Sequence, residues 1–252
     1  MAGCSGSVPG PDSPASCYLV RSPWQGRDYN LCLDLGNGAL GTLQRHLAVT
    51  DIDAVVLSHL HPDHCLDVCG LYVALRYGPV RPRGRLPVHG PAGLARRLAR
   101  AYEVHEGGAP ELEALLDFQP LTDRVPLRLG PFSVTPYRVS HPVEAYGLRV
   151  EADGAVLAYT GDTDACDALR PLCTGASLML SDAASVEGVN AERGIHLSAR
   201  RAAAAAVEAG GVRRLMLTHI PPWSNPQVCR SQAAQVWPGE VELAAPDLTF
   251  EL

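Results

Sequence analysis

The stretch Ser58-His59-Leu60-His61-Pro62-Asp63-His64 decides how this chain is interpreted. It follows a short apolar run, 54–57, and brings together imidazoles and a carboxylate, which are ligands of Zn²⁺ or a similar divalent ion. His59 and His61 are two apart in an extended loop, so both can face one ion. Asp63 and His64 follow where the chain turns into a helix, and can face a second ion. A bare H-x-H would be unremarkable in a solvated loop, but H-x-H-x-D-H after an apolar strand indicates a metal site.

Working outward, three further candidate ligands each follow a predicted strand. They are His141, Asp162 and His219. A single such residue is more often structural or merely exposed, but three in this order after the histidine cluster are jointly much more specific. Open sheets place their sites at strand ends, where loops converge on a rigid support.

The remaining pattern predicts strands alternating with helices. Strands are expected at 31–35, 54–57, 132–139, 147–151, 155–160, 177–180 and 215–218, and helices from 63 to 75, from about 92 to 104 and from 198 to 209. Asp153-Gly154 predicts a tight hairpin turn, Pro136 an edge or bulge, and Ser198 a helix N-cap. The Pro- and Gly-rich segment 78–91 resembles a long loop.

Composition sets the limits on function. The chain has 252 residues, 46% of them hydrophobic, and we expect a single domain over 1–252. The net charge is −6, and Arg is the only strongly basic residue type in the chain, so there is no surplus of positive charge for binding a long polyanion. Arg81, Arg83 and Arg85 form one local cluster, interpreted as a solvated loop.

The cellular context is expected to be cytoplasmic. No apolar stretch reaches the roughly 18 residues that a membrane helix needs, and residues 1–10 lack a signal-peptide pattern. None of the eight cysteines forms a C-x-x-C pair. We therefore expect reduced, mostly buried thiols.

These motifs resemble the metallo-β-lactamase superfamily in its ribonuclease Z-like branch. The five motifs of the branch correspond to Asp34-Leu35-Gly36, H-x-H-x-D-H, His141, Gly161-Asp162-Thr163 and His219. The resemblance implies the α/β class and a four-layer αβ/βα sandwich with its site along one edge. It implies two divalent ions, with Zn²⁺ preferred over Mn²⁺ or Fe²⁺. The implied first set is His59, His61, His141 and Asp162, and the second is Asp63, His64, Asp162 and His219, so that Asp162 bridges the ions.

The same resemblance points to a general acid. Ribonuclease Z-like enzymes carry a His-Glu-Ala-Thr and a His-Ser-Thr stretch where this chain has 181–184 and 196–198. Aligned so, His196 is retained, Asp182 replaces the glutamate and Ser181 replaces the histidine. A carboxylate that orients an imidazole makes a competent acid for a leaving alkoxide. We take His196 and Asp182, together with the ligand Asp63, as catalytic residues; the alternative for the first two is a helix-start or core role.

Within the branch, transfer RNA is an unlikely substrate. Ribonuclease Z uses a basic arm between its third and fourth motifs, and the segment from His141 to Asp162 has no room for one. A closer resemblance is to bacterial atypical, class II-related cyclic-nucleotide phosphodiesterases. It rests on Gly3-Cys4-Ser5-Gly6-Ser7 with 11–16, on Leu43-Gln44-Arg45-His46, and on 217–223.

That resemblance implies hydrolysis of 3′,5′-cyclic AMP to a 5′-nucleotide. A hydroxide shared by the two ions would attack the cyclic phosphate, and His196 would protonate the departing 3′ oxygen. Among nearby aromatic residues, Trp223 is the best candidate for stacking on the base, followed by Tyr146, with Tyr72 and Tyr77 as further possibilities. The expected partner is a small nucleotide, and a homodimer is a family-level expectation.

The same residues are compatible with two alternative functions. One is a different hydrolase on the same fold: a 2′,3′-cyclic phosphate or RNA phosphodiesterase, a thioesterase, a lactonase or a β-lactamase. The other is a metal-binding regulator without catalysis, which would be consistent with the departures from the family pattern at Ser181 and Asp182.

Overall fold

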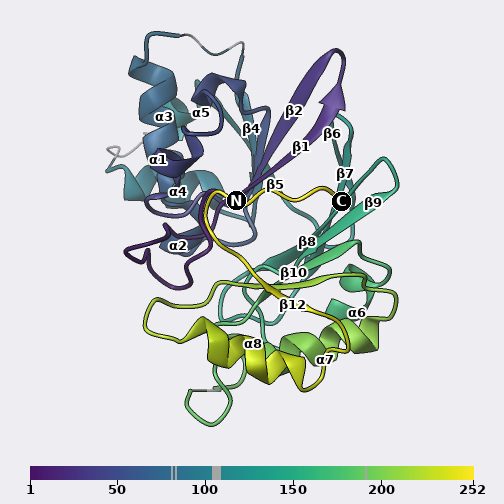
Figure 1. Ribbon diagram of the computed structural model, residues 1–252. Helices are drawn as coiled ribbons and strands as arrows, with labels where there is room; N and C mark the ends of the chain where they lie inside the picture. Colours follow the sequence, from purple (N-terminus) through teal and green to yellow (C-terminus); the bar gives the residue numbers. More distant parts are fainter. Residues whose placement is uncertain (81, 83, 104–108, 191) are drawn as a thin grey trace.

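Two β-sheets face each other, and helices cover the outer face of each (Figure 1). This computed structural model describes residues 1–80, 82, 84–103, 109–190 and 192–252. The helix–sheet–sheet–helix order is the expected four-layer α/β sandwich, so the predicted fold class is confirmed.

The first sheet has the strand order β1-β2-β3-β4-β5. Strands β1 and β2 form an antiparallel hairpin, and the next three pairings are parallel. The strands are β1 (Tyr18–Trp24), β2 (Arg27–Leu33), β3 (Ala54–Val56), β4 (Leu86–Gly90) and β5 (Leu116–Pro120). Every residue of β3 is buried, which explains the apolar run ahead of the histidine cluster.

The second sheet has the order β12-β11-β10-β9-β8-β7-β6. Its strands are β6 (Leu127–Leu129), β7 (Phe132–Arg138), β8 (Tyr146–Ala152), β9 (Ala155–Tyr159), β10 (Leu178–Asp182), β11 (Leu215–Thr218) and β12 (Val241–Leu243). The β8–β9 turn is the predicted Asp153-Gly154, with φ of 50° and 81°; positive φ at both positions is the requirement of a tight hairpin turn. Strands β7, β9, β10 and β11 run in the same direction, so their carboxyl ends meet at one edge.

The helices divide between the two outer layers (Figure 1). The first sheet is accompanied by α1 (Ala39–Leu43), the short 3₁₀ turn Val49–Asp51, α2 (Pro62–Cys65), α3 (Asp67–Tyr77), α4 (Leu94–Ala101) and α5 (Ala109–Glu113), and the second by α6 (Leu169–Cys173), α7 (Ala199–Ala209) and α8 (Pro226–Ala234). Helix α7 begins as predicted, because the Ser198 side chain accepts a hydrogen bond from the Arg201 N–H. Among the described residues, no helix is long and apolar enough to cross a membrane.

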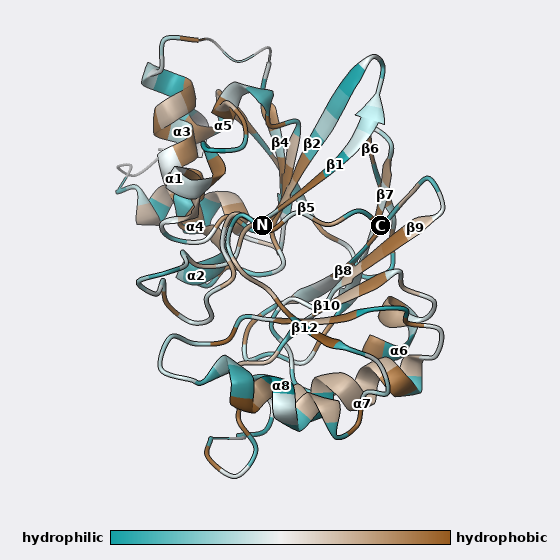
Figure 2. Cartoon of the chain, viewed as in Figure 1, coloured by the Kyte–Doolittle hydropathy of each residue, from teal (hydrophilic) through white to brown (hydrophobic). Residues whose placement is uncertain are grey.

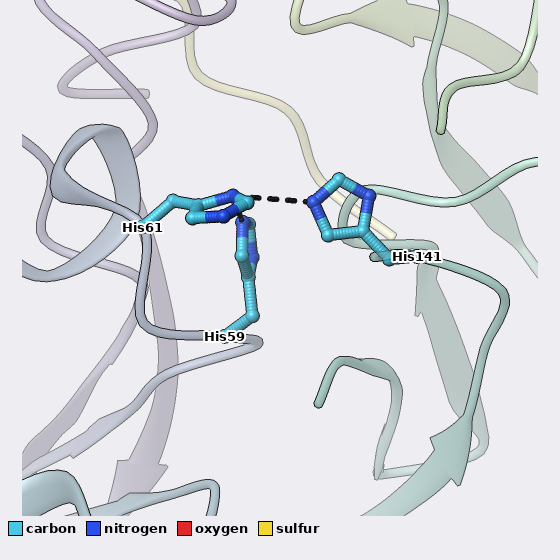
Figure 3. Close-up of side chains that lie close together, drawn as sticks. All are labelled: His59, His61 and His141. Atoms are coloured by element: carbon cyan, nitrogen blue, oxygen red, sulfur yellow. Dashed lines mark hydrogen bonds between the residues drawn. The ribbon is translucent and has the colours of Figure 1, made fainter. Parts of the chain in front are cut away.

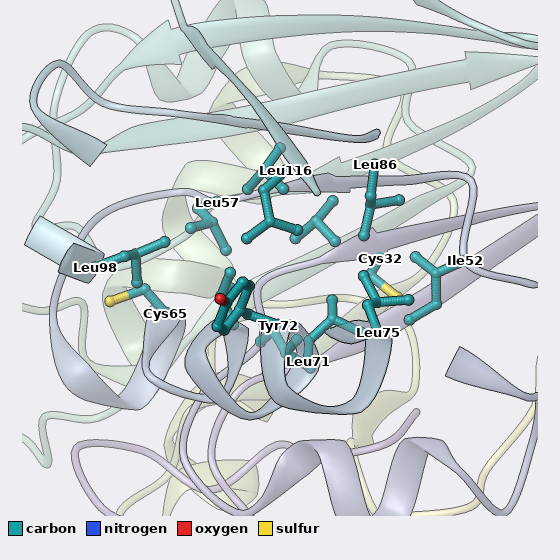
Figure 4. Packing of buried hydrophobic residues seen from close by; sticks show 14 of the residues in the cluster. Cys32, Ile52, Leu57, Cys65, Leu71, Tyr72, Leu75, Leu86, Leu98 and Leu116 are labelled. Atoms are coloured by element: carbon teal, nitrogen blue, oxygen red, sulfur yellow. The ribbon is translucent and has the colours of Figure 1, made fainter. Parts of the chain in front are cut away.

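Three apolar cores hold the layers together. The central core lies between the sheets and includes Leu33, Val56, Leu148 and Met216. One outer core packs α3 and α4 against the first sheet (Figure 4), and the other packs α6, α7 and α8 against the second. In Figure 2 strand β9 is largely hydrophobic, while the tip of the β1–β2 hairpin is hydrophilic. All eight cysteines are free, and six are buried.

Several predicted boundaries were wrong; β2, for example, spans Arg27–Leu33 where a strand was expected at 31–35. Residues 86–90 form β4 inside the segment taken as a loop; Pro87 obscured the pattern, although its neighbour Val88 is fully buried. The helix expected from about residue 92 begins at Leu94, because Gly93 before it has a left-handed φ of 83°. Of the arginine cluster, Arg81 and Arg83 lie outside the described residues, and Arg85 forms an ion pair with Asp117 at 2.8 Å.

Candidate metal centre

The predicted ligands converge from both sheets onto one edge of the sandwich. His59 and His61 lie in the loop between β3 and α2. His141, Asp162 and His219 follow the carboxyl ends of β7, β9 and β11, which all lie at the same edge. Residues 57 to 156 positions apart in the sequence therefore become neighbours.

Three imidazoles form the first group (Figure 3). His59 Nε2 lies 3.0 Å from His61 Nδ1, which lies 3.2 Å from His141 Nε2. Zn–N bonds of 2.0–2.1 Å in a tetrahedral site place ligand nitrogens about 3.4 Å apart, so this spacing fits three ligands of one ion. His141 Nδ1 faces the Ile195 carbonyl oxygen at 2.9 Å, which requires an N–H there and leaves the lone pair on Nε2. Burial lowers the pKa of all three imidazoles, favouring the neutral form that binds metal.

The second group comprises Asp63, His64, Asp162 and His219, all buried. His219 Nε2 lies 3.1 Å from Asp63 Oδ2 and 3.4 Å from Asp162 Oδ2, and His64 Nε2 lies 3.2 Å from Asp162 Oδ1. The other Asp162 oxygen also lies 3.7 Å from His59 Nε2. Asp162 thus stands between the two groups, the position that a bridging ligand requires.

The electrostatics of the second group favour a cation. Burial would raise the pKa of Asp162, but His219, His64 and His59 hold it well below its usual value. Burial would lower the pKa of His219, yet Asp162, Asp182 and Asp63 raise it to about 10. The carboxylates therefore attract positive charge that protons supply in the absence of metal. A divalent ion supplies it more directly and displaces the protons.

Asp34 supports the second group from behind. Its carboxylate lies 2.7 Å from His64 Nδ1 and accepts hydrogen bonds from the Ser58 N–H at 2.6 Å, the Ser58 hydroxyl at 2.8 Å and the Tyr159 hydroxyl at 2.7 Å. Asp34 is fully buried and has a φ of 59°. Such contacts fix the tautomer and direct the Nε2 lone pair of His64 toward the centre.

His196 and Asp182 form the expected pair beside the two groups. His196 Nδ1 lies 2.9 Å from Asp182 Oδ2, so the shorter aspartate does reach the imidazole. The His196 ring lies 5.3 Å from that of His219 and 5.5 Å from that of His141, centroid to centroid. Asp182 is fully buried at the end of β10 and also accepts from the Thr163 and Ala184 N–H groups. Burial lowers the pKa of His196, but Asp182 outweighs it and raises that pKa.

The predicted base-binding aromatics lie in different surroundings. Trp223 is 65% exposed, four residues after His219. Tyr146 is buried, and its hydroxyl donates to Glu144 at 2.8 Å. Tyr72 packs against Tyr102 inside the first outer core, while Tyr77 is exposed at the end of α3. A role for Trp223 or Tyr146 in substrate binding stays a prediction.

Sequence reasoning missed the residues that hold the site in place. Ser58 and Tyr159 support Asp34, and Asp164 anchors the segment before His196 by accepting from the Gly194 N–H at 2.8 Å and pairing with Arg193 at 2.9 Å. The only available signal for Asp164 was its place two residues after a predicted ligand.

Comparison with known proteins identifies the family. A family model described as a β-lactamase superfamily domain matches residues 29–220. The chain belongs to this family. An uncharacterized protein of Mycobacterium tuberculosis is 42% identical over 253 residues, which cover 100% of this chain and 91% of that protein. A ribonuclease Z of Mycobacterium bovis is 29% identical, covering 96% of this chain and 94% of that protein.

The Bacillus subtilis protein YhfI is similar in both sequence and structure. Named a probable metallo-hydrolase, it is 32% identical over 257 residues, covering 100% of this chain and 98% of that protein. Its crystal structure, titled as a metallo-β-lactamase fold protein, superposes with a TM-score of 0.86 at 27% identity, covering 100% of this chain and 98% of that chain. The metallo-β-lactamase fold and the ribonuclease Z-like resemblance are therefore confirmed.

Proposed function

We propose that this protein is a metal-dependent phosphodiesterase that hydrolyses 3′,5′-cyclic nucleotides such as cyclic AMP to 5′-nucleotides. The observation that carries the proposal is the His196–Asp182 pair, 2.9 Å apart, beside two groups of metal-binding side chains. Relatives named probable metallo-hydrolase and ribonuclease Z support a hydrolase of this superfamily.

The two groups of side chains fit two divalent ions. His59, His61 and His141 would hold the first, Asp63, His64 and His219 the second, and Asp162 would bridge them. When bound, the ions supply a nucleophile at neutral pH and neutralise charge on the phosphoryl oxygens. Zn²⁺ suits this mixture of imidazole and carboxylate, and Mn²⁺ or Fe²⁺ would accept the same ligands.

His196 supplies the proton that the leaving oxygen needs. Asp182 fixes the orientation of the ring through Nδ1 and stabilises its protonated form, which leaves Nε2 as the atom that donates. A ribose alkoxide is a poor leaving group and requires such a proton, whereas a thiolate or a nitrophenolate does not. This pair therefore favours phosphodiesters over thioesters.

Two features favour a small nucleotide over transfer RNA. Between His141 and Asp162 the chain forms only the β8–β9 hairpin, which leaves no arm, and the net charge is −6. Trp223 offers an exposed indole shortly after the ligand His219, suitable for stacking on a base.

The test is a substrate panel on protein loaded with Zn²⁺ or Mn²⁺. It contains cyclic AMP, other cyclic mononucleotides, 2′,3′-cyclic AMP, cyclic dinucleotides, bis-p-nitrophenyl phosphate, a thioester, a lactone and a β-lactam. We expect cyclic AMP to be cleaved to the 5′-nucleotide, and elemental analysis to find two ions per chain. If the phosphodiesters are inert while a thioester, lactone or lactam turns over, the proposal is wrong.

The His196→Ala variant tests the role of the acid separately. Loss of a general acid lowers the rate by about 10²–10⁴-fold, so we expect such a loss with cyclic AMP but a much smaller one with bis-p-nitrophenyl phosphate. His46→Ala serves as the control, because His46 contacts Asp247 away from the centre. Equal losses with both substrates would remove His196 as the proton donor.

A further inference from the structure

A strained turn at Gly6-Ser7-Val8 lies against the metal centre. The Val8 N–H donates to the Gly6 carbonyl oxygen at 2.7 Å, and Ser7 between them has a φ of 63°. A three-residue turn with a positive central φ is rare and strained for a residue other than glycine. Such strain persists only where the surroundings enforce it, and it gathers at functional sites.

Contacts to the segment that carries His219 enforce this turn. The Gly6 N–H donates to the Ile220 carbonyl oxygen at 3.2 Å, and the His219 N–H donates to the Cys4 carbonyl oxygen at 3.1 Å. A Cβ on Gly6 would lie 2.0 Å from the His219 carbonyl oxygen, so no other residue fits there. His219 itself has a φ of 57°. The unfavourable backbone conformations of Ser7 and His219 are therefore held in place by contacts between the two segments.

The Ser7 N–H points at His219 Nε2, 3.3 Å away. An imidazole nitrogen has one in-plane position, which holds either a proton or a lone pair. The same atom lies 3.1 Å from Asp63 Oδ2 and 3.4 Å from Asp162 Oδ2, and it is the atom offered to the second ion. Once Nε2 binds a cation, it has no lone pair left to accept from Ser7.

With a cation on His219 Nε2, the Ser7 N–H becomes a fixed donor that is available to another acceptor. Ser7 is an exposed residue, and its N–H is directed toward the centre. The neighbouring N–H groups already have acceptors, because Gly6 donates to the Ile220 carbonyl oxygen and Val8 to the Gly6 carbonyl oxygen. A backbone donor held in place beside a developing negative charge stabilises that charge without reorganising.

We propose that the Ser7 N–H binds a phosphoryl oxygen of the substrate beside the second metal group. This inference rests on the phosphodiesterase function proposed above and assigns the oxygen a protein donor in addition to the ions. The backbone, and not the Ser7 side chain, provides the contact, because the turn fixes the N–H direction while the hydroxyl is free to rotate.

The first experiment observes the N–H directly. Protein labelled with [¹⁵N]serine and loaded with Zn²⁺ is titrated with inorganic phosphate, and the serine amides are followed by NMR. We expect the Ser7 amide proton to move downfield with the same midpoint as phosphate binding measured by calorimetry. Ser231, exposed on α8, provides the internal control and should not move. A Ser7 signal that stays fixed at saturating phosphate would overturn the inference.

The second experiment removes the N–H alone. An α-hydroxy acid at position 7 replaces the amide with an ester and keeps the side chain. Since a hydrogen bond to a charged group is involved, we expect phosphate to bind about tenfold more weakly or worse at equal zinc content. The matched control is the same replacement at Gln25, which is exposed with a φ of 50° at the tip of the β1–β2 hairpin; its phosphate affinity should match that of the wild type.

The outcomes separate the two proposals. If the ester protein binds zinc and phosphate as tightly as the wild type, Ser7 has no part in binding, while phosphodiesterase activity can still stand. If the ester protein fails to fold, the wild-type NMR titration decides. If zinc-loaded wild-type protein neither binds phosphate nor cleaves any phosphodiester, both proposals are wrong.

Discussion

Replacing Asp34 with asparagine should weaken the second metal group selectively. The Asp34 carboxylate receives the Ser58 N–H on Oδ1, and the Ser58 hydroxyl, the Tyr159 hydroxyl and His64 Nδ1 on Oδ2. Asparagine keeps the size and tolerates the φ of 59°, but one of its two terminal atoms is an NH₂ donor. The substitution therefore changes hydrogen bonding with little change in packing.

Both orientations of the new amide are unfavourable. With the NH₂ group at the Oδ1 position, two donors, this group and the Ser58 N–H, face each other. One buried donor is then unpaired, which costs about 1–3 kcal/mol of stability. With NH₂ at the Oδ2 position, His64 must accept through Nδ1, so its proton moves to Nε2 and blocks metal binding. Loss of this kind of support lowers metal affinity about 10–100-fold, or about 1.4–2.8 kcal/mol.

The assay is a competitive titration of metal-free protein with Zn²⁺ against a chromophoric chelator. We expect the Asp34→Asn variant to lose affinity in one of two binding steps, because His59, His61 and His141 do not contact Asp34. The control is Asp67→Asn, since the Asp67 carboxylate at the start of α3 accepts from the backbone N–H groups of Leu40 and Gly38. If Asp34→Asn binds both ions as tightly as the wild type, the assignment of His64 as a ligand supported by Asp34 is refuted.

Three further perturbations have defined outcomes. Gly36→Ala would place a Cβ 1.9 Å from a backbone carbonyl oxygen, so we expect a loss of about 3 kcal/mol in denaturant unfolding; Gly41→Ala, with open space around its Cβ, should be neutral or slightly stabilising. Asp164→Asn should release the segment before His196 and lower kcat about tenfold at unchanged metal content, measured with cyclic AMP; an unchanged kcat would argue against this anchoring role. Because the pKa of His219 is raised from 6.5 to about 10 without metal, its contribution to stability is complete below pH 6.5 and disappears as the pH rises through 10. Melting temperatures of chelator-treated protein should therefore fall over that range more than those of zinc-loaded protein.

The sequence predicted which side chains come together, because candidate metal ligands are chemically distinctive and lie next to strand ends. His59 and Asp63 stand together in one short loop, while Asp162 and His219 each follow a buried apolar strand. Strands β3, β9 and β11 could be placed because their apolar runs are continuous. Ligand chemistry and strand position together are local properties, which a sequence displays directly.

The supporting residues could not be predicted, because their roles depend on tertiary contacts. Nothing local shows that Asp34 faces His64 across the fold, or that an aspartate at 182 is long enough to reach His196. The turn at Ser7 likewise gains its meaning only from its contact with His219, 212 positions away. Strand β4 was missed for a different reason, since Pro87, Gly90 and Pro91 made the segment resemble a loop.

The candidate metal ligands are divided between the two sheets, and this division has a consequence for assembly. His59, His61, Asp63 and His64 follow β3 of the first sheet, whereas His141, Asp162 and His219 follow strands of the second. Neither sheet alone supplies a full coordination sphere, so two bound ions would link the first sheet to the second. Metal uptake during refolding should then report the moment when the two sheets dock, later than the formation of either sheet.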